Sequence, residues 1–278
     1  MSLFKSKKSR KTSSAPRELM TRNTHFVITE AYKRLRTNLL FMLSGNKKVI
    51  AFTSTMPSEG KTTNCLNIAI AFAEAGNKIL VIDMDMRKPR VHTSFDFDLS
   101  PGLSDALISP DKKPNIKATD RENLFVLTAG TKPPAPPELL MTSEFETLLN
   151  ALREEYDYIF IDTPPVHIVS DLSVVANKFD GIVYVVREKT VPLRTLKKSV
   201  EQLENVQAHV LGFIFNDSEK SSLFAKYAYR YKYSYKYGYR YGSYGFRYGY
   251  TYGYEDSTDE NGETVRIKTK KKIRKENK

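Results

Sequence analysis

One short segment, residues 55–62, has the residue types that bind the phosphates of a nucleotide. Its sequence fits the Walker A loop, except that Thr55 stands where such a loop begins with Gly. In this loop backbone N–H groups point at the phosphates and Gly60 lets the backbone approach closely, while Lys61 reaches the β- and γ-phosphates and Thr62 binds Mg²⁺. An apolar run precedes the segment and an amphipathic pattern follows it, so the context disfavours an ordinary strand-to-helix turn.

Two other segments supply carboxylates. Asp162 ends an apolar run, at the place where a Walker B carboxylate would hold the Mg²⁺ shell, although a strand-end Asp can also be only a turn former. Asp83 and Asp85 follow another apolar run at i and i+2, a spacing that directs two side chains the same way, toward one metal–phosphate centre. On spacing alone they could equally be solvated loop residues.

These groups need a scaffold, and the hydrophobic pattern indicates which one. Continuous apolar runs suit strands buried on both faces of a parallel sheet, and they occur at 49–53, 79–83, 124–127, 158–162, 182–186 and 210–215. Helical patterns alternate with these runs, at 28–43, at 61–75 with Gly76 as its stop, at 143–155 and at 193–204. This order predicts an α/β fold with a doubly wound, mainly parallel sheet flanked by helices.

The composition excludes two classes of protein. With 278 residues and 40% apolar residues, the chain can bury the core of one domain of about 200 residues. Cys65 is the single cysteine, so a disulfide scaffold is excluded. No apolar run reaches the roughly 18 residues of a membrane-spanning helix. The basic N-terminus has no apolar region behind it and does not resemble a secretory signal, so we expect a cytosolic protein.

The net charge of +12 belongs to the tails. Residues 1–22 carry seven Lys or Arg and one Glu, and residues 223–278 carry fourteen Lys or Arg and six Asp or Glu. The nearly neutral middle disfavours a nucleic-acid-binding domain, whose basic face would lie on the folded body. Basic tails suit an anionic membrane surface, an acidic partner or nucleic acid, and charge alone does not choose among them.

The composition changes abruptly near the C-terminus, because 13 of the 28 residues from 227 to 254 are Tyr, separated mostly by Lys, Arg and Gly. Without aliphatic residues this segment cannot offset its ordering entropy by burial. We therefore expect a basic disordered arm at 1–24, a folded domain at 25–222, a tyrosine-rich flexible tail at 223–254 and a charged disordered tail at 255–278.

Together these motifs resemble those of the bacterial tyrosine kinases, the P-loop kinases of capsular and exopolysaccharide assembly, in the form without a fused membrane domain. The resemblance covers roughly residues 25–254. It rests on the Walker A variant with Pro57 and Glu59, a second Walker A′ motif at 82–87, the Walker B motif at Asp162 and the terminal tyrosine cluster. The related partitioning ATPases place a lysine early in the loop, where this chain has Met56, and fit less well.

The resemblance implies a P-loop NTPase fold, ATP and Mg²⁺ as cofactors, and roles for single residues. The residues that would bind ATP are Ser58, Glu59, Gly60, Lys61, Thr62, Thr63 and Asn216. Those that would hold Mg²⁺ are Thr62, Asp83, Asp85 and Asp162. Lys61 and the three carboxylates would form the catalytic set, with Asp83 or Asp85 taking the tyrosine proton. For Asn216, contact with adenine and a plain turn role are equal interpretations.

The resemblance also implies that the chain phosphorylates its own tail in a neighbouring subunit of a ring. The acceptors would be Tyr227, Tyr229, Tyr231, Tyr233, Tyr235, Tyr237, Tyr239, Tyr241, Tyr244, Tyr248, Tyr250, Tyr252 and Tyr254. Glu30, Lys33 and Arg36 match the family's self-association motif except for Lys33, where the family has Arg. A solvated helical face with weak intrahelical pairs is the alternative for these three.

Further partners follow from the same resemblance. A separate transmembrane adaptor would activate the chain through its cytosolic end, a cognate tyrosine phosphatase would reverse the reaction, and no nucleic acid is expected. The chain would then be peripheral at the inner face of the plasma membrane. There the N-terminal arm would either add electrostatic attraction or be merely disordered.

Two other functions stay open from the residues alone. One is a P-loop ATPase of the partitioning type whose Tyr, Lys and Arg tail binds single-stranded nucleic acid or a partner. The other is a nucleotide-gated switch with a low-complexity interaction tail and negligible phosphotransfer. Phosphotyrosine mapping after incubation with ATP and Mg²⁺ separates both from a kinase.

Overall fold

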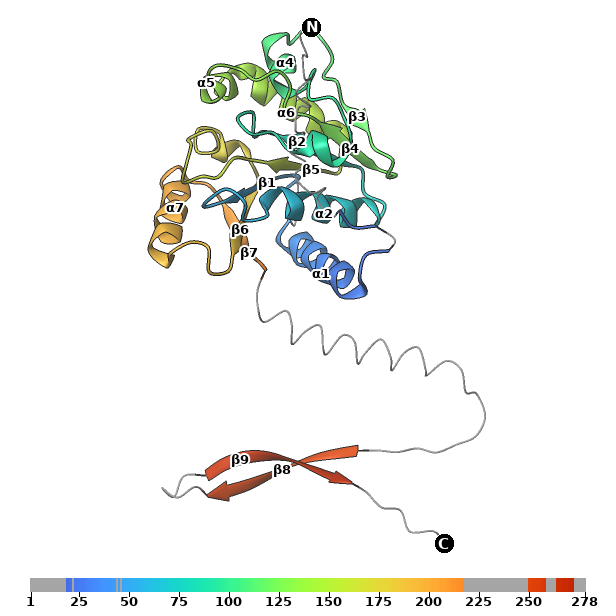
Figure 1. Ribbon diagram of the computed structural model, residues 1–278, viewed down its shortest axis with the longest axis vertical. Coiled ribbons are helices and arrows are strands. Elements are labelled where there is room, and N and C mark those ends of the chain that lie inside the picture. The colour runs from blue at the N-terminus through green and yellow to red at the C-terminus, as the bar shows by residue number, and fades with distance from the viewer. Residues whose placement is uncertain are drawn as a thin grey trace, which may run out of the picture. The chain divides into compact units, whose positions relative to one another are not determined.

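The computed structural model describes residues 19–21, 23–43, 45, 47–217, 250–258 and 264–272. The chain divides into two compact units, Met1–Lys226 and Tyr227–Lys278. The described part of the first unit is built around one seven-stranded sheet in the order β3-β4-β2-β5-β1-β6-β7 (Figure 1). The strands are β1 Val49–Ser54, β2 Ile79–Asp83, β3 Lys117–Ala118, β4 Leu124–Leu127, β5 Tyr158–Asp162, β6 Gly181–Arg187 and β7 Val210–Asn216.

The sheet is parallel except at one edge, where β3 pairs antiparallel with β4. Each of the six apolar runs forms a strand, so the predicted doubly wound α/β fold is confirmed. The sequence did not indicate β3, because two residues are too few to show a period.

Helices cover both faces of the sheet. They are α1 Phe26–Met42, α2 Lys61–Ala73, α3 Val91–Ser94, α4 Leu103–Ile108, α5 Pro136–Leu140, α6 Ser143–Glu155 and α7 Leu193–Asn205, with a 3₁₀ turn at Ala176–Lys178. The four predicted helices are present, and α2 ends before Gly76, whose φ of +90° favours glycine. The short helices α3, α4 and α5 were not predicted, since four to six residues give no reliable helical period.

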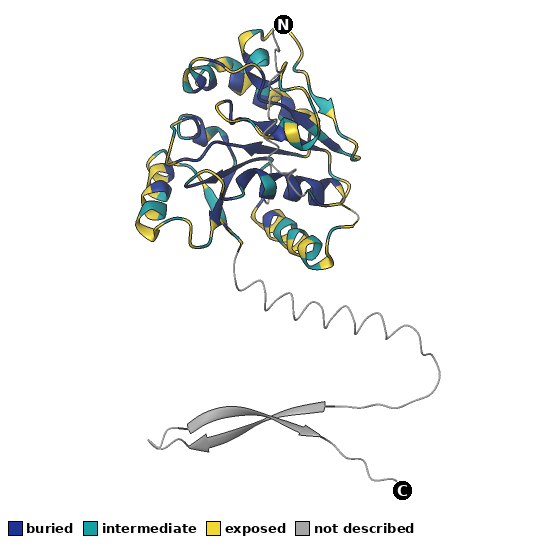
Figure 2. Cartoon of the chain, viewed as in Figure 1, coloured by how far each residue is buried: buried dark blue, intermediate teal, exposed yellow. Residues whose placement is uncertain are grey.

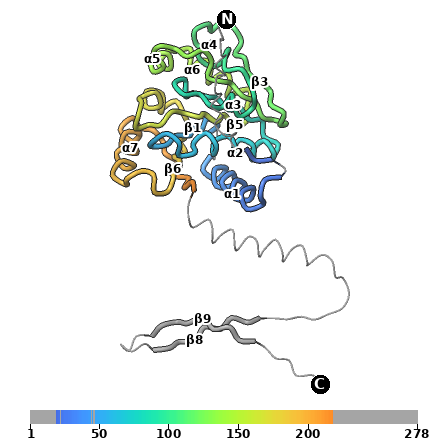
Figure 3. Tube along the Cα trace, viewed as in Figure 1, coloured from blue at the N-terminus to red at the C-terminus, as the bar shows by residue number. Residues whose placement is uncertain are grey.

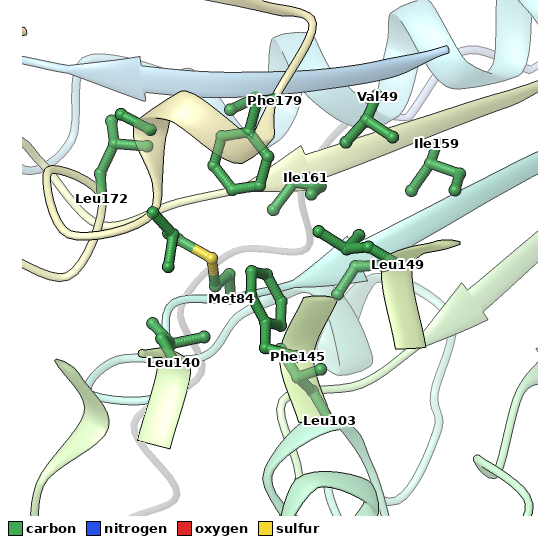
Figure 4. Close-up of a cluster of buried hydrophobic side chains, with 14 of the residues drawn as sticks. Val49, Met84, Leu103, Leu140, Phe145, Leu149, Ile159, Ile161, Leu172 and Phe179 are labelled. Carbon is green, nitrogen blue, oxygen red and sulfur yellow. The ribbon is translucent and has the colours of Figure 1, made fainter. Parts of the chain in front are cut away.

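Two hydrophobic clusters hold these layers together. On one face, α2 packs directly on the sheet and α1 packs against α2 (Figure 3). On the other face, side chains from α4, α5, α6 and α7 meet the sheet. Phe145 and Leu149 of α6 lie beside Ile159 and Ile161 of β5 in this second cluster (Figure 4). The central strands are buried throughout, whereas α1 and α7 present exposed faces (Figure 2). This packing fixes the ends of the strands from which the site is built.

The strand register brings the phosphate-binding loop and the carboxylates together at the carboxyl ends of the central strands. β5 lies between β1 and β2, and Asp162 is the register partner of both Phe52 and Asp83. Because these strands are parallel, their carboxyl ends lie side by side and their following loops meet. The Walker A loop, the segment after β2 and the end of β5 therefore converge, although Lys61 and Asp162 are 101 residues apart in the chain.

The N-terminal segment departs from the expected disordered arm at 1–24. Met20 is buried, its N–H donates to Asn67 Oδ1 at 2.8 Å and its carbonyl accepts from Arg121 at 2.5 Å. An apolar side chain and two backbone bonds thus attach this segment to the folded domain, and the boundary predicted at residue 25 comes too late. The remainder of the arm, residues 1–18, lies outside the described residues.

The second unit contains an antiparallel pair of strands, β8 Tyr250–Thr258 and β9 Thr264–Lys272. We expected no regular structure after residue 222, because the tail lacks residues that could be buried in a core. Tyr, Thr, Val and Ile also favour strands through local pairing. Residues 218–249 lie outside the described part. Within the described residues, no helix is both long and apolar enough to span a bilayer.

Candidate active site

The phosphate-binding loop connects β1 to α2. Gly60 forms the N-cap of α2 with φ of +92°, and Ser58 also has a positive φ, of 68°. Lys61 is the first residue of the helix, so the free N–H groups and the positive end of the helix dipole lie at this loop. Local sequence therefore builds a site suited to an anion before any tertiary contact is considered.

Tertiary contacts add charged side chains to this loop. Lys61 Nζ lies 3.3 Å from Asp85 Oδ2 and 3.3 Å from Asp162 Oδ1. The hydroxyl of Thr62 donates to Asp162 Oδ2 at 2.6 Å. All four residues are buried, so the structure places Asp85 away from the solvated position that the spacing left open. Two carboxylates thus share one ammonium in a region of low dielectric, which leaves an excess of one negative charge.

Asp83 occupies a different place from its neighbour Asp85. Its Oδ2 accepts from the N–H groups of Arg90 and Val91, both at 2.9 Å, and its Oδ1 accepts from the N–H of Asp85 at 3.2 Å. It is fully buried and does not line the cavity described below. The two carboxylates therefore do not both face one centre, because the chain turns after β2 and wraps its backbone around Asp83.

The charges of this cluster shift one another's proton affinity. Burial lowers the pKa of Lys61, but the charges of Asp162, Asp85 and Asp83 raise it by more, so the ammonium form of Lys61 is favoured. Burial raises the pKa of Asp162, and Lys61 and the Thr62 hydroxyl offset only part of that rise. Burial, followed by the charge of Asp162, raises the pKa of Asp83 to about 7.

The raised pKa of Asp83 predicts a pH-dependent stability. Between about pH 4 and pH 7, folded Asp83 keeps a proton that the unfolded chain has released, so its contribution to the unfolding free energy falls as pH rises. We expect the Asp83→Asn variant to show a smaller decline across this range in urea unfolding with EDTA and without nucleotide. The exposed control Asp111→Asn should keep the wild-type slope, and equal slopes for all three proteins would contradict the prediction.

The remaining loop residues hold the backbone of the loop. Glu59 is buried and accepts from the N–H groups of Met56 at 2.6 Å and Arg187 at 3.3 Å. Asn216, at the end of β7, donates to the Glu59 carbonyl at 3.0 Å. Neither Glu59 nor Asn216 lines the cavity, so the structure places both beneath the loop.

The left-handed backbone and the close approach of Asn216 both favour glycine at position 60. A Cβ at Gly60 would lie 2.2 Å from Asn216 Nδ2, and the φ of +92° would itself strain any other residue. We expect Gly60→Ala to weaken ATP binding about tenfold, the cost of a left-handed residue. Equilibrium titration with a fluorescent ATP analogue measures this. The control is Gly212→Ala, because a Cβ at Gly212 meets nothing within 4 Å. Equal ATP affinities for Gly60→Ala and the wild type would show that the loop adjusts to the added methyl group.

A cavity of about 590 Å³ opens beside this cluster. One wall comes from the loop and α2, including Ser58, Gly60, Lys61, Thr62 and Thr63, which were all predicted to bind ATP. Other parts of the wall come from the segment after β2, with Asp85, Arg87, Lys88 and Arg90, and from the segment after β5, with Pro164, Pro165, Ile168 and Val169. The size of the cavity and the positive charge of Lys61 in its wall suit a nucleoside triphosphate.

The donor set fits Mg²⁺ better than a metal held by protein alone. Among the residues that the structure describes, no three His, Cys, Asp or Glu side chains are arranged to hold a metal ion. Mg²⁺ usually takes one or two protein oxygens and completes its shell with phosphate and water. Thr62 in the cavity wall and the buried Asp162, which accepts from the Thr62 hydroxyl at 2.6 Å, match that requirement, whereas Asp83 is already occupied by backbone N–H groups.

Two polar contacts at the site were not predicted. Arg87 forms a two-pronged ion pair with the buried Asp171, at 2.9 Å from Nε to Oδ2 and 2.9 Å from Nη2 to Oδ1. Thr55, which stands where the loop usually begins with Gly, is buried and pairs with the hydroxyl of the buried Tyr184 at 2.9 Å. Arg87 lay within a motif noted in the sequence, but no local signal pointed to Asp171.

The predicted self-association residues make contacts within the chain. Lys33 pairs with Glu30 at 2.9 Å on the exposed side of α1, as the intrahelical alternative expected. Arg36 is half-buried and donates to the Ala71 carbonyl of α2 at 2.8 Å. Of the predicted acceptors, ten lie outside the described residues, and Tyr250, Tyr252 and Tyr254 lie in β8.

The parallel sheet, the loop at the start of α2 and the carboxylates at two strand ends define a P-loop NTPase. A family model described as an AAA domain matches residues 47–212. The septum site-determining protein MinD of Pyrococcus horikoshii, complexed with Mg-ADP, shares this fold, with 24% identity, a TM-score of 0.52, and coverage of 63% of this chain and 72% of its own.

Relatives with higher identity narrow the class. Tyrosine-protein kinase CpsD of Streptococcus pneumoniae is 40% identical over 190 residues, covering 67% of this chain and 83% of its own length. Tyrosine-protein kinase YwqD of Bacillus subtilis is 35% identical, covering 72% and 85%. The kinase domain of Escherichia coli tyrosine kinase ETK superposes with a TM-score of 0.65 at 31% identity, covering 68% and 74%. The chimerical protein CapA2B2 does so with a TM-score of 0.64 at 36% identity, covering 68% and 84%. The chain belongs to the bacterial tyrosine kinases of capsular and exopolysaccharide assembly.

Proposed function

We propose that this tyrosine kinase transfers the γ-phosphate of ATP to tyrosines of its own C-terminal cluster, from one subunit to another. The observation that carries the proposal is the position of Lys61, held between Asp85 and Asp162 at the wall of a nucleotide-sized cavity. The same chain supplies 13 tyrosines within 28 residues.

Each charged group has a separate task in this scheme. Lys61 neutralises the transferring phosphate, while Thr62 and Asp162 would hold Mg²⁺, which spreads the charge of the phosphate oxygens when bound. The acceptor oxygen attacks the γ-phosphorus, the bond to the ADP oxygen breaks, and the phenolic proton passes to a carboxylate. Asp85 is the base in this scheme, because it lines the cavity and Asp83 does not. Asp83 positions the loop that carries Asp85.

Positioning accounts for most of this catalysis. Phosphoryl transfer needs little covalent help, so a fixed cation and an aligned acceptor lower the barrier. A tyrosine hydroxyl has a pKa near 10, and Asp85 therefore needs to accept the proton only late in the transfer.

Mixing two variants tests whether the chain phosphorylates tyrosine and whether the phosphate passes from one subunit to another. One chain carries Lys61→Met with its tyrosines intact, and the other keeps its active site but has all 13 cluster tyrosines changed to Phe. With ATP, Mg²⁺ and the cytosolic segment of an adaptor, phosphotyrosine should appear on the Lys61→Met tail only in the mixture. Label on wild type but not in the mixture would exclude transfer between subunits. ATP hydrolysis without any phosphotyrosine would support the partitioning-type ATPase instead.

We propose further that the chain works with a transmembrane adaptor at the inner membrane face and assembles as a ring. The likeness to the chimerical protein CapA2B2 supports a partner of this kind. Each phosphate adds about −1.5 to −2 charges at pH 7, so four to six phosphates would cancel the +8 of residues 223–278. The all-Phe variant should therefore show a larger oligomer mass in light scattering than the phosphorylated protein. Equal masses would contradict the proposal that phosphorylation dissociates the ring.

A further inference from the structure

Exposed cations line the mouth of the phosphate cavity. Arg87, Lys88 and Arg90 are all exposed, and they line the same cavity as Lys61 and Asp85. Arg87 is engaged by Asp171, and Glu138 also adds negative charge near it. Within the described part of the chain, neither Lys88 nor Arg90 forms an ion pair with a carboxylate. Two cations are therefore free to meet an incoming anion.

Asp83 and Asp85 hold the backbone of the segment that carries these cations. The N–H of Lys88 donates to Asp85 Oδ1 at 2.9 Å, and the N–H of Arg90 donates to Asp83 Oδ2 at 2.9 Å. Pro89 lies between them and restricts the backbone further. The backbone of the positive mouth is thus fixed beside the cavity that Asp85 and Lys61 line, so the mouth can favour one acceptor over another.

The tyrosine cluster presents two different charge environments. Between residues 223 and 250 the chain carries six Lys or Arg among the tyrosines and no Asp or Glu. Directly after Tyr254 the chain carries five carboxylates, at Glu255, Asp256, Asp259, Glu260 and Glu263, with no Lys or Arg among them. A positive mouth repels the first group and attracts the second.

We infer that Lys88 and Arg90 select tyrosines followed by acidic residues, so that Tyr252 and Tyr254 are phosphorylated before the tyrosines at 227–241. This inference rests on the proposed transfer to the tail, and it names the order of acceptors and the residues that impose it. It also assigns other substrates of this kinase to one chemical class, namely extended segments with a tyrosine and carboxylates on its C-terminal side.

The strand pair of the second unit is compatible with this order. Tyr252 and Tyr254 lie in β8, where Tyr254 is the register partner of Lys268 and Asp256 that of Arg266. An isolated two-stranded hairpin is only marginally stable in water. Opening it costs little, and it frees the acidic segment to meet the cations of another subunit.

The test follows single tyrosines in time. The acceptor is the full chain with Lys61→Met, and the enzyme is the full chain with its cluster tyrosines changed to Phe. Rapid quenching and mass mapping give the rate at each tyrosine. With two exposed charges on each side, we expect Tyr252 and Tyr254 to react about fivefold faster than the tyrosines at 227–241 at low salt, and this preference should fade as salt is added.

Reversing the charges first on the enzyme and then on the acceptor supplies the decisive comparison. The enzyme variant Lys88→Glu/Arg90→Glu should lose the preference, and the acceptor variant Glu255→Lys/Asp256→Lys should lose it with the unmodified enzyme. Combining the two should recover about the original ratio. The control enzyme, Lys197→Glu/Lys198→Glu on the exposed side of α7, should behave as the unmodified one. The acceptor variant leaves the enzyme untouched, so a folding defect in the charge-reversed enzyme does not spoil the test.

The outcomes separate this inference from the proposed function. Equal rates at all tyrosines, or a charge reversal that slows every tyrosine by the same factor, would overturn the selection by Lys88 and Arg90 while the kinase stands. The absence of phosphotyrosine with the unmodified enzyme and its adaptor segment would overturn the proposed transfer itself, and the selection with it.

Discussion

Replacing Lys61 by Met is expected to lower tyrosine phosphorylation by about a thousandfold, the upper range for the loss of one positioned charge at a reacting oxygen. Lys61 is the cation that balances Asp85 and Asp162, and it lies at the wall of the phosphate cavity. Its methylene stem would be replaced by a chain of similar length without the charge. Radiolabel from γ-labelled ATP that resists alkali measures the effect.

A loss of folding must be separated from this loss of chemistry. Removing Lys61 leaves buried carboxylates without their partner, which is costly unless they take up a proton. The double variant Lys61→Met/Asp85→Asn restores the charge balance, so it should unfold near the wild-type temperature and still be inactive. Lys198→Met on the surface of α7 is the matched control. Labelling of the folded double variant at wild-type rates would refute the role of Lys61.

Asp162→Asn is expected to lower phosphorylation by about a hundredfold. An amide has nearly the same shape, but it loses the charge that pairs with Lys61 Nζ at 3.3 Å and weakens the bond with the Thr62 hydroxyl. The change should also lower the pKa of Asp83, because the charge of Asp162 helps to raise it. Steady-state rates at increasing Mg²⁺ concentrations measure the first effect.

The pattern of the loss identifies what Asp162 does. If Asp162 helps to hold Mg²⁺, the variant should need a higher Mg²⁺ concentration for half-maximal rate, whereas Asp111→Asn should not. A reduced rate with an unchanged Mg²⁺ requirement would instead show that Asp162 acts only by positioning Lys61 and Thr62. An unchanged rate would remove Asp162 from the site.

Much of the fold was predictable because its signals are local. Each of the six buried strands is a continuous apolar run. The signals that start and end α2, the glycine-containing loop before it and Gly76 after it, lie next to the helix in the sequence. The short helices and β3 gave no period, and the contact of Met20 with Asn67 joins residues 47 positions apart. Residue-by-residue patterns carry no information about such distant partners.

The sequence by itself indicated the class of this protein, through the resemblance of the loop at 55–62, the strand-end Asp162 and the tyrosine cluster to the motifs of the bacterial tyrosine kinases. Tertiary structure decided where each carboxylate lies. Asp83 and Asp85 look equivalent as a pair, yet backbone N–H groups surround Asp83 while Asp85 lines the cavity beside Lys61. It also decided that Lys88 and Arg90 lie at the mouth of that cavity. The physical reason is that hydrogen bonds and charges act through space, and the turn after β2 sets those distances.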